Sequence, residues 1–366
     1  MKENITDLLF KELKDILIKR DVNPRIAYQI FNWIYRKFQF NFLEMSDISK
    51  KLRNFLDDNF QILSLKYVKH LISEDEEAIK FLFETNDKNL IETVLIISPK
   101  SDDESRLTLC VSSQIGCPLK CEFCATGQAG FKRNLFPSEI ISQVLMVERF
   151  IMDSEKLNFF NHGKEGSLRN IGNIVFMGMG EPFLNIESVL KSVEILTFSG
   201  GYNIGSRHIT LSTAGILDSF DFIKNVDSQI RLAVSLHSPF QEVRERLMPV
   251  AKTNDLSHLI EELASYQKET KRRITFEYVL LDGINDREAD AKELKELLKN
   301  LDYNLNLIPY NPVENENLRP SSEKAFRDFI LSLEKYGIPY VVRKSKGGKI
   351  KAGCGQLSYA KRESHI

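Results

Sequence analysis

The chain has 366 residues, of which 42% are hydrophobic and 28% charged, and its formal net charge is −1. These values are ordinary for a globular protein, and the near-neutral charge does not by itself indicate a nucleic-acid partner. No apolar run is long enough to span a bilayer, and the first residues lack the apolar core of a signal peptide, so we expect a cytoplasmic protein with no membrane partner.

Residues 1–60 are predicted to form a small helical domain with its own core. Apolar residues recur at helical spacing within 8–17 and 27–35, and a third amphipathic stretch begins near Ser46. Residues 62–98 then alternate between apolar and polar side chains, which is typical of a short sheet. We expect the polar run 98–104 to be a loop.

From Leu107 onward, strands and amphipathic helices alternate, which favours a parallel α/β sheet, either curled into a partial barrel or open. The polar stretch 153–170 is interpreted as a surface insertion. The predicted strands are Leu107–Val111, Asn173–Met177, His208–Leu211, Ile230–Ser235, Arg273–Val279 and Asn304–Ile308. The predicted helices are Ser138–Phe150, Ile186–Thr197, Ser257–Lys268, Arg287–Leu301 and Glu323–Tyr336.

Chemically unusual residues follow the carboxyl ends of these strands. In parallel α/β folds that edge of the sheet carries the active site. The residues are, in chain order, Cys117–Cys124, Gly178–Glu181, Ser212–Thr213, Ser235–His237 and Asn311.

Cys117, Cys121 and Cys124 have the spacing C-x3-C-x2-C. Three thiolates are one short of the four that a four-iron cluster takes, so one iron stays open to bind a reacting molecule. Cys110, seven residues earlier, offers an alternative, because it would complete a four-cysteine zinc site. Zinc ribbons usually pair two C-x2-C knuckles, and only one is present here, which favours the cluster.

The other candidate residues also have plain structural interpretations. Gly180 and Glu181 fit a tight turn followed by an acidic helix start. Ser212 and Asn311 fit ordinary caps, and His237 fits a core histidine whose ring is hydrogen-bonded. Their shared position at the strand ends is what raises them as ligand-binding candidates.

Two further residues stand outside the strand-end pattern. Cys354 is a lone thiol in a Gly-rich, basic loop, where Lys349 and Lys351 are expected to favour its nucleophilic thiolate. Its structural alternative is a buried, inert thiol. Glu92 lies on the alternating segment, where its plain interpretation is a charge that faces solvent.

Several motifs together resemble the radical S-adenosylmethionine enzymes, and most closely the RlmN-type adenine C2 methyltransferases of ribosomal and transfer RNA. The resemblance covers nearly the whole chain. The matching stretches, apart from the cysteine motif, are Thr108–Gln114, Phe131–Leu135, Met177–Pro182, Leu211–Thr213, Ser235–His237, Arg246–Pro249, Phe276–Gly283, Asn306–Pro312 and Ala352–Leu357.

This resemblance implies an α/β fold, a partial (βα)6 barrel with a small helical N-terminal accessory domain. Residues 1–60 would be that accessory domain, facing RNA, and 61–102 a small β linker. Residues 103–345 would be the radical S-adenosylmethionine core. Residues 346–366 would be a C-terminal segment that carries Cys354 and, being basic, helps to grip RNA.

The resemblance also implies roles for individual residues. Cys117, Cys121 and Cys124 would hold a 4Fe–4S cluster. Cys354 would be the methyl carrier, Cys110 its disulfide partner late in the cycle, and Glu92 the active-site base. The residues that would contact S-adenosylmethionine are Gly180, Glu181, Ser212, Ser235, Leu236, His237 and Asn311.

The activity implied is methylation of adenine carbon 2 in 23S rRNA, at the peptidyl-transferase centre, and in tRNA, on the 3′ side of the anticodon. It would consume two S-adenosylmethionine molecules per turnover and need an electron donor such as flavodoxin or ferredoxin, and the enzyme would be a monomer. The alternatives are a Cfr-type methyltransferase of adenine carbon 8 and, in another class, a non-catalytic zinc-dependent RNA-binding protein.

The chain departs from the family pattern just before the carrier cysteine. Family members often have acidic residues there, whereas this chain has Lys349 and Lys351. Gly353 replaces a more usual alanine and is expected to loosen the loop.

Overall fold

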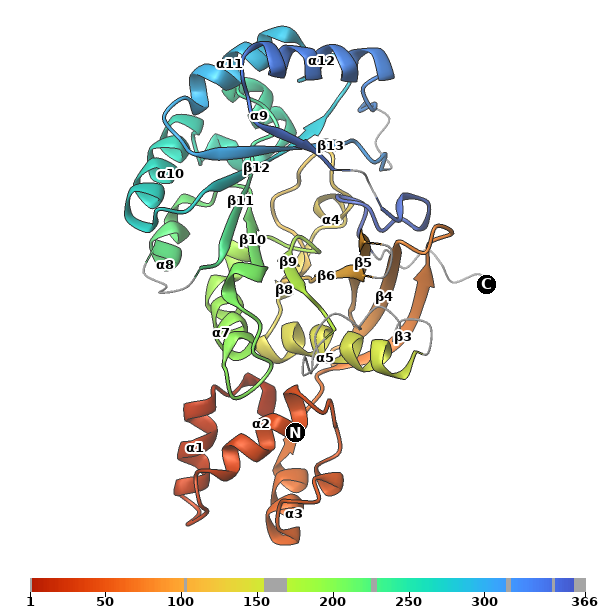
Figure 1. Cartoon of the computed structure of the whole chain (residues 1–366), viewed down its shortest axis with the longest axis vertical. Helices are drawn as coiled ribbons and strands as arrows, with labels where there is room; N and C mark the ends of the chain where they lie inside the picture. The colour runs from red at the N-terminus through yellow and green to blue at the C-terminus, as the bar shows by residue number, and fades with distance from the viewer. Residues whose placement is uncertain are drawn as a thin grey trace.

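The structure is a computed structural model that describes residues 2–101, 104–154, 170–224, 229–313, 317–343 and 346–358. A helical lobe at the N-terminus lies at one end of the molecule, and a large sheet with helices along its outside forms the rest (Figure 1). No helix in these ranges is long and apolar enough to cross a membrane.

The N-terminal lobe consists of α1 (Phe10–Ile18), α2 (Ile26–Tyr35) and α3 (Lys50–Asn59), as the helical spacing predicts. Its ends meet where β1 (Glu3–Asn4) pairs with β2 (Phe60–Gln61). Leu13, Leu17, Ile30 and other apolar side chains of these helices are fully buried. They join one continuous core with the rest of the protein, so the expected separate core of the lobe is corrected.

Aromatic stacking attaches this lobe to the rest of the protein. Phe198 directly follows α7 (Ile186–Thr197). Its ring stacks on that of Phe10 in α1, with the ring centroids 4.4 Å apart. Arg36 Nε adds a hydrogen bond of 2.9 Å to the carbonyl of Gly201. Both contacts join residues far apart in sequence, so they fix the lobe against the turn that follows α7.

One sheet of ten strands organises the rest, in the order β14-β13-β12-β11-β10-β9-β6-β5-β4-β3. Strand β6 and strands β9 to β14 run parallel, and β3 to β5 add an antiparallel wing. The strands are β3 (Leu65–Ile72), β4 (Ala78–Thr85), β5 (Leu90–Ser101), β6 (Glu104–Cys110), β9 (Asn173–Phe176), β10 (Ile209–Thr213), β11 (Arg231–Ser235), β12 (Ile274–Leu280), β13 (Tyr303–Pro309) and β14 (Tyr340–Val342).

All six predicted parallel strands are present, and two expectations about the wing are corrected. Residues 62–98 do not form a sheet of their own, because β3 to β5 continue the parallel sheet through the pairing of β5 with β6. The expected loop at 98–104 is largely strand, since β5 runs to Ser101 and β6 starts at Glu104. Backbone pairing between these two long strands overrides the polar composition.

The five predicted helices are confirmed, with ends shifted by a few residues, and they lie along the outside of the sheet (Figure 1). The prediction of an insertion at 153–170 falls mostly outside the described residues. The helices after the N-terminal lobe are α4 (Ala125–Gln128), α5 (Pro137–Asp153), α7, α8 (Phe220–Lys224), α9 (Gln241–Leu247), α10 (Leu256–Thr270), α11 (Glu288–Leu298) and α12 (Glu323–Lys335).

The strand register separates apolar and polar side chains onto opposite faces of the sheet. Alternate residues share a face, and directly paired residues of neighbouring strands share it too. Leu211, Val234 and Phe276 are fully buried on one face. The other face carries a row of polar and charged residues across seven strands: Lys80, Glu92, Cys110, Ser212, Ser235, Glu277 and Asn306.

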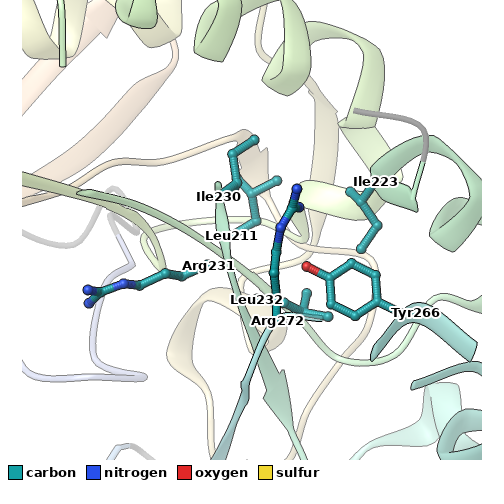
Figure 2. A pocket seen from close by; sticks show the side chains of 7 residues that line it. All are labelled: Leu211, Ile223, Ile230, Arg231, Leu232, Tyr266 and Arg272. Carbon is teal, nitrogen blue, oxygen red and sulfur yellow. The ribbon is translucent and has the colours of Figure 1, made fainter. Parts of the chain in front are cut away.

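A small pocket lies outside this polar face. It has a volume of about 10 Å³, close to the room that one water needs, and is lined mainly by apolar side chains of β10, β11 and α10 (Figure 2). None of the candidate site residues lines it. The space is a packing gap, and the functional site is elsewhere.

Burial on the apolar face predicts how substitutions there change the free energy of unfolding. Phe276 is fully buried and meets the ring of Tyr303, so Phe276→Ala should lower the free energy of unfolding by about 3–5 kcal/mol through lost burial and a cavity. Phe222→Ala, at a ring that is 45% exposed, is the control and should change it by less than about 1 kcal/mol. Urea denaturation measures both, and equal effects would contradict the assignment of the apolar face.

Candidate active site

A short hairpin closes the base of the cysteine loop. Strands β7 (Gln114–Gly116) and β8 (Phe131–Asn134) pair on either side of the loop, and the Cys117 backbone N–H donates to the Gly130 carbonyl at 3.0 Å. Gly116 has φ +74°, and a Cβ there would lie 1.8 Å from the Gly130 oxygen. Glycine is therefore required at this position for the loop to close.

The three cysteines of the motif lie close enough to influence one another. Burial, together with the charges of Glu181 and Cys124, raises the pKa of the Cys117 thiol to about 12. Burial likewise raises the pKa of Cys121, with Cys124 and Cys117 adding to the effect. Thiolates gathered at a buried point need a compensating positive charge, which a metal centre supplies.

The donor set fits a four-iron cluster. Within the described residues, no group of three His, Cys, Asp or Glu side chains converges on a single-ion site. In a four-iron cluster each cysteine binds a different iron, so the sulfurs need not converge on one point. When bound, such a cluster supplies the single electron that cleaves S-adenosylmethionine. Cys117, Cys121 and Cys124 are the residues that would hold it.

Glu181 follows β9 on a sharp turn. Gly180 has φ +106°, and a Cβ there would lie 2.6 Å from Gln114, so glycine is needed for the close approach. The Glu181 carboxylate accepts hydrogen bonds from the backbone N–H groups of Phe183 (3.0 Å) and Ala214 (2.8 Å). Burial raises its pKa to about 7, against the lowering effect of these bonds. The Thr213 hydroxyl bonds the carboxylate as well, and of the roughly four acceptor positions of a carboxylate one remains for a ligand ammonium group.

His237, just after β11, has a left-handed backbone conformation with φ +56°. Its Nδ1 accepts a hydrogen bond from the Val279 backbone N–H at 3.1 Å, so the proton of the neutral ring lies on Nε2. Burial lowers its pKa to about 3. The ring meets Phe123 of the cysteine loop edge-to-face at 4.6 Å between centroids. His237 therefore ties the end of β11 to the cysteine loop.

The remaining strand-end candidates keep their predicted positions. Ser212 and Ser235 are half-buried on the polar face of the sheet, and the Leu236 backbone N–H donates to the Glu277 carbonyl at 3.0 Å. Asn311 follows β13, where its Nδ2 donates to the Cys354 carbonyl at 3.2 Å. Contact of these residues with S-adenosylmethionine stays a prediction.

The C-terminal segment lies across the strand ends and the cysteine loop. Ala125, directly after Cys124, donates its backbone N–H to the Gly355 carbonyl at 2.7 Å, and the Thr126 hydroxyl donates to the Leu357 carbonyl. A Cβ at Gly353 would lie 2.8 Å from Asn311 Nδ2. Gly353 thus permits a close approach, whereas the sequence led us to expect only a looser loop.

Cys354 and Cys110 are brought together from distant parts of the sequence. Both are free thiols, and a charge on Cys354 raises the pKa of Cys110, which burial has already raised. The surface of Cys354 is open to solvent, yet protein surrounds its sulfur densely enough that desolvation, with the charge of Glu277, raises its pKa to about 11. The two thiols therefore lie near each other, at the carboxyl end of β6.

The expected effect of Lys349 and Lys351 on Cys354 is wrong. Lys349 forms an ion pair with Glu74 at 2.5 Å, and both side chains are largely exposed. The cation that lowers the pKa of Cys354 is Arg343, which follows β14, and desolvation outweighs it. Lys349 attaches the segment to the turn between β3 and β4, and neither lysine is among the groups that shift the pKa of Cys354.

Glu92 is also differently placed from its plain interpretation. Its side chain is 5% exposed and forms an ion pair of 2.9 Å with Lys80. The Glu92 carbonyl accepts from the Ser112 hydroxyl at 2.6 Å, which joins β5 to the turn after β6. Glu92 therefore faces the polar side of the sheet, with Cys110 on the neighbouring strand.

Sequence reasoning missed three buried charged residues. Glu277 pairs in register with Ser235 and accepts from Asn306 Nδ2 at 2.9 Å, and burial raises its pKa. Lys80 pairs with Glu92, and Arg244 donates to the Ala214 carbonyl beside Glu181. The alternation of apolar and polar residues along β12 and β4 could have indicated that Glu277 and Lys80 face the polar side of the sheet. No sequence pattern on α9 indicated the burial of Arg244.

The described geometry is that of a known class of enzyme. The model of the radical SAM superfamily matches residues 111–294, and that of the ribosomal RNA large subunit methyltransferase N-terminal domain matches residues 3–62. Together with the cysteine loop at the mouth of a parallel sheet, this defines a radical S-adenosylmethionine enzyme.

Relatives and a solved structure give the family. The chain is 40% identical over 357 residues to a probable dual-specificity RNA methyltransferase RlmN of Thermotoga sp. strain RQ2, covering 97% of each chain. It is 41% identical to the protein of that description from Dictyoglomus turgidum, covering 97% of this chain and 96% of the relative. A crystal structure of a radical SAM methyltransferase from Sphaerobacter thermophilus matches with TM-score 0.88 and 39% identity, covering 97% and 98%. The chain belongs to the RlmN family of radical S-adenosylmethionine RNA methyltransferases.

The buried Glu181 carboxyl predicts a pH effect on the metal-free protein. Its pKa of about 7 in the folded state exceeds the ordinary 4.5, so the folded protein binds the extra proton and stability falls as pH rises between these values. Glu181→Gln removes this component, on the order of 3 kcal/mol at most. The unfolding free energy of the natural protein minus that of the variant should therefore fall between about pH 5 and about pH 8. Parallel pH profiles would contradict the burial of this charge.

Proposed function

We propose that this enzyme methylates carbon 2 of adenine in 23S rRNA, and of the adenine on the 3′ side of the anticodon in tRNA, through a methyl-cysteine on Cys354. The observation that carries the proposal is the pair of free thiols, Cys354 and Cys110, beside the cysteine loop. The relatives named above are described as dual-specificity enzymes, which supports both RNA substrates.

The substrate explains why a carrier thiol is needed. Carbon 2 of adenine lies between two ring nitrogens and is electron-poor, so it does not attack the methyl group of S-adenosylmethionine. A thiolate does attack it, and covalent catalysis divides a difficult transfer into easier steps. The carrier must then be activated at its methyl carbon, which is a task for radical chemistry.

In this proposal the residues act in order. The Cys354 thiolate, favoured by the cofactor's sulfonium charge, takes a methyl group from one S-adenosylmethionine, whose carbon–sulfur bond breaks. A second S-adenosylmethionine, cleaved with one electron from the cluster, would supply the radical that removes a hydrogen atom from that methyl, and the remaining carbon would join adenine carbon 2. Glu92 accepts the proton of carbon 2. The adduct would return its odd electron to the cluster, and Cys110 would attack the sulfur of Cys354. A disulfide then forms as the carbon–sulfur bond breaks, and the released carbon takes up a proton and becomes the methyl group of the base.

The remaining parts of the proposal concern partners. The target base must leave its stack to reach the polar face, as for other enzymes that act on a base. The N-terminal lobe and the C-terminal segment would hold the surrounding RNA by its shape and phosphates. We propose a monomer in the cytoplasm, supplied with electrons by a flavodoxin or a ferredoxin.

Mass spectrometry of nucleosides tests the activity directly. RNA from cells that lack the gene, treated with the reconstituted enzyme, should gain 2-methyladenosine in both rRNA and tRNA. Cys354→Ala should abolish the product because no carrier remains. A product of 8-methyladenosine would instead identify the carbon 8 activity, and product formed by Cys354→Ala would refute the carrier role.

The resolving role of Cys110 gives a separate prediction. In Cys110→Ala the last step has no attacking thiol, so a covalent protein–RNA adduct should accumulate, and turnover should fall by at least about 100-fold. Denaturing gels with labelled RNA detect the adduct. Ser113→Ala, at a buried hydroxyl on the same turn, is the control and should leave no adduct. Normal turnover of Cys110→Ala without an adduct would contradict this role.

A further inference from the structure

Lys80 occupies a central place on the polar face, although nothing in the motifs draws attention to it. It lies on β4, paired in register with Val94 of β5. Its side chain is only 12% exposed, and its Nζ is 2.9 Å from Glu92 Oε1. The same Nζ donates to the Lys351 carbonyl at 3.4 Å, three residues before Cys354. Lys80 thus touches both the strand of Glu92 and the segment of Cys354.

Stability alone does not account for such a pair. Removing an ammonium and a carboxylate from water is costly, and buried ion pairs are often no better for stability than apolar side chains of similar size. A buried pair that also contacts a third element is better explained by the geometry that it fixes. Here the Lys80–Glu92 pair fixes the position of the Lys351 backbone relative to β5.

The other lysine contacts of the same segment differ in what they reach. Lys346 Nζ donates to the Ile97 carbonyl at 2.7 Å and lies 3.3 Å from Glu77. Lys349 pairs with the exposed Glu74. These contacts attach the segment to the outer part of the wing, whereas the contact of Lys80 leads to Glu92. Lys349 thus holds the same segment without contacting Glu92.

We propose that Lys80 is a positioning residue, which holds the Glu92 carboxylate at a fixed place relative to the Cys354 segment so that base and methyl carrier reach one adenine together. The inference rests on the proposed roles of Glu92 and Cys354. It adds a residue that acts through Glu92 and the segment backbone and does not itself touch the substrate.

The test compares three variants of the reconstituted full-length enzyme. Lys80→Met should slow RNA methylation by about 10–100-fold, the size of effect that a misplaced catalytic group produces. It should leave methylation of Cys354 and the formation of 5′-deoxyadenosine within about twofold of the natural enzyme, which also shows that the protein is folded. Lys80→Arg should recover part of the activity, since it keeps the charge and can donate to both partners. Lys299→Met, which removes an exposed ion pair with Glu296 at the end of α11, is the control and should have less than about a twofold effect.

A double variant shows whether Lys80 acts through Glu92. If it does, adding Lys80→Met to Glu92→Gln should cause little further loss, because the positioned group is already absent. Losses that multiply, or a fully active Lys80→Met, would overturn the inference.

Failure of the wider proposal gives a different pattern. A Glu92→Gln enzyme that is fully active would refute the base role itself and would remove the premise of the inference. An inactive Glu92→Gln with a fully active Lys80→Met would refute only the role of Lys80. Loss of Cys354 methylation in Lys80→Met would show a structural role in place of the positioning role.

Discussion

The structure depends on a concentration of buried groups that carry negative charge when ionised. Cys117, Cys121 and Glu181 influence one another at the mouth of the sheet, and burial raises the pKa of each. Ionising them together without a counter-charge is unfavourable in a site of low dielectric constant. The site is therefore built for a cationic centre, and a cluster held by three thiolates, together with the sulfonium of S-adenosylmethionine, would provide one.

The second constraint is that the C-terminal segment must close over the cysteine loop. The chain returns after its last strand and lays the Cys354 segment over the loop that begins the site, with Gly355 hydrogen-bonded beside Cys124 and Cys354 beside Asn311. The antiparallel wing holds the other side of this segment through Lys80, Lys346 and Lys349. Cys354, Cys110 and Glu92, the proposed methyl carrier, resolving thiol and base, come from separate parts of the sequence. The sheet register puts Glu92 and Cys110 on one face, and the C-terminal segment brings Cys354 near Cys110.

The sequence predicted most of what local pattern determines. The cysteine spacing, the strand-end residues and the six parallel strands follow from motifs and alternation, and the structure has them. The sequence did not reveal which residues pair across long distances in the chain. The exposure of Glu92 was misjudged because its partner Lys80 lies on another strand, and an alternating strand alone does not tell which face is buried. Likewise, the effect of Lys349 on Cys354 was misjudged because Glu74, distant in sequence, takes up its charge. The end of β5 was missed because a polar composition conceals a strand that pairs well.

The central claim is that three cysteines hold a cluster that cleaves S-adenosylmethionine. It is tested most directly by reconstituting the protein anaerobically with iron and sulfide, adding a reductant and S-adenosylmethionine, and measuring 5′-deoxyadenosine. We predict about four irons and four sulfides per chain, with steady formation of 5′-deoxyadenosine that Cys124→Ala abolishes. A fully loaded protein that never forms 5′-deoxyadenosine, or one that forms it equally well without Cys124, would contradict the account.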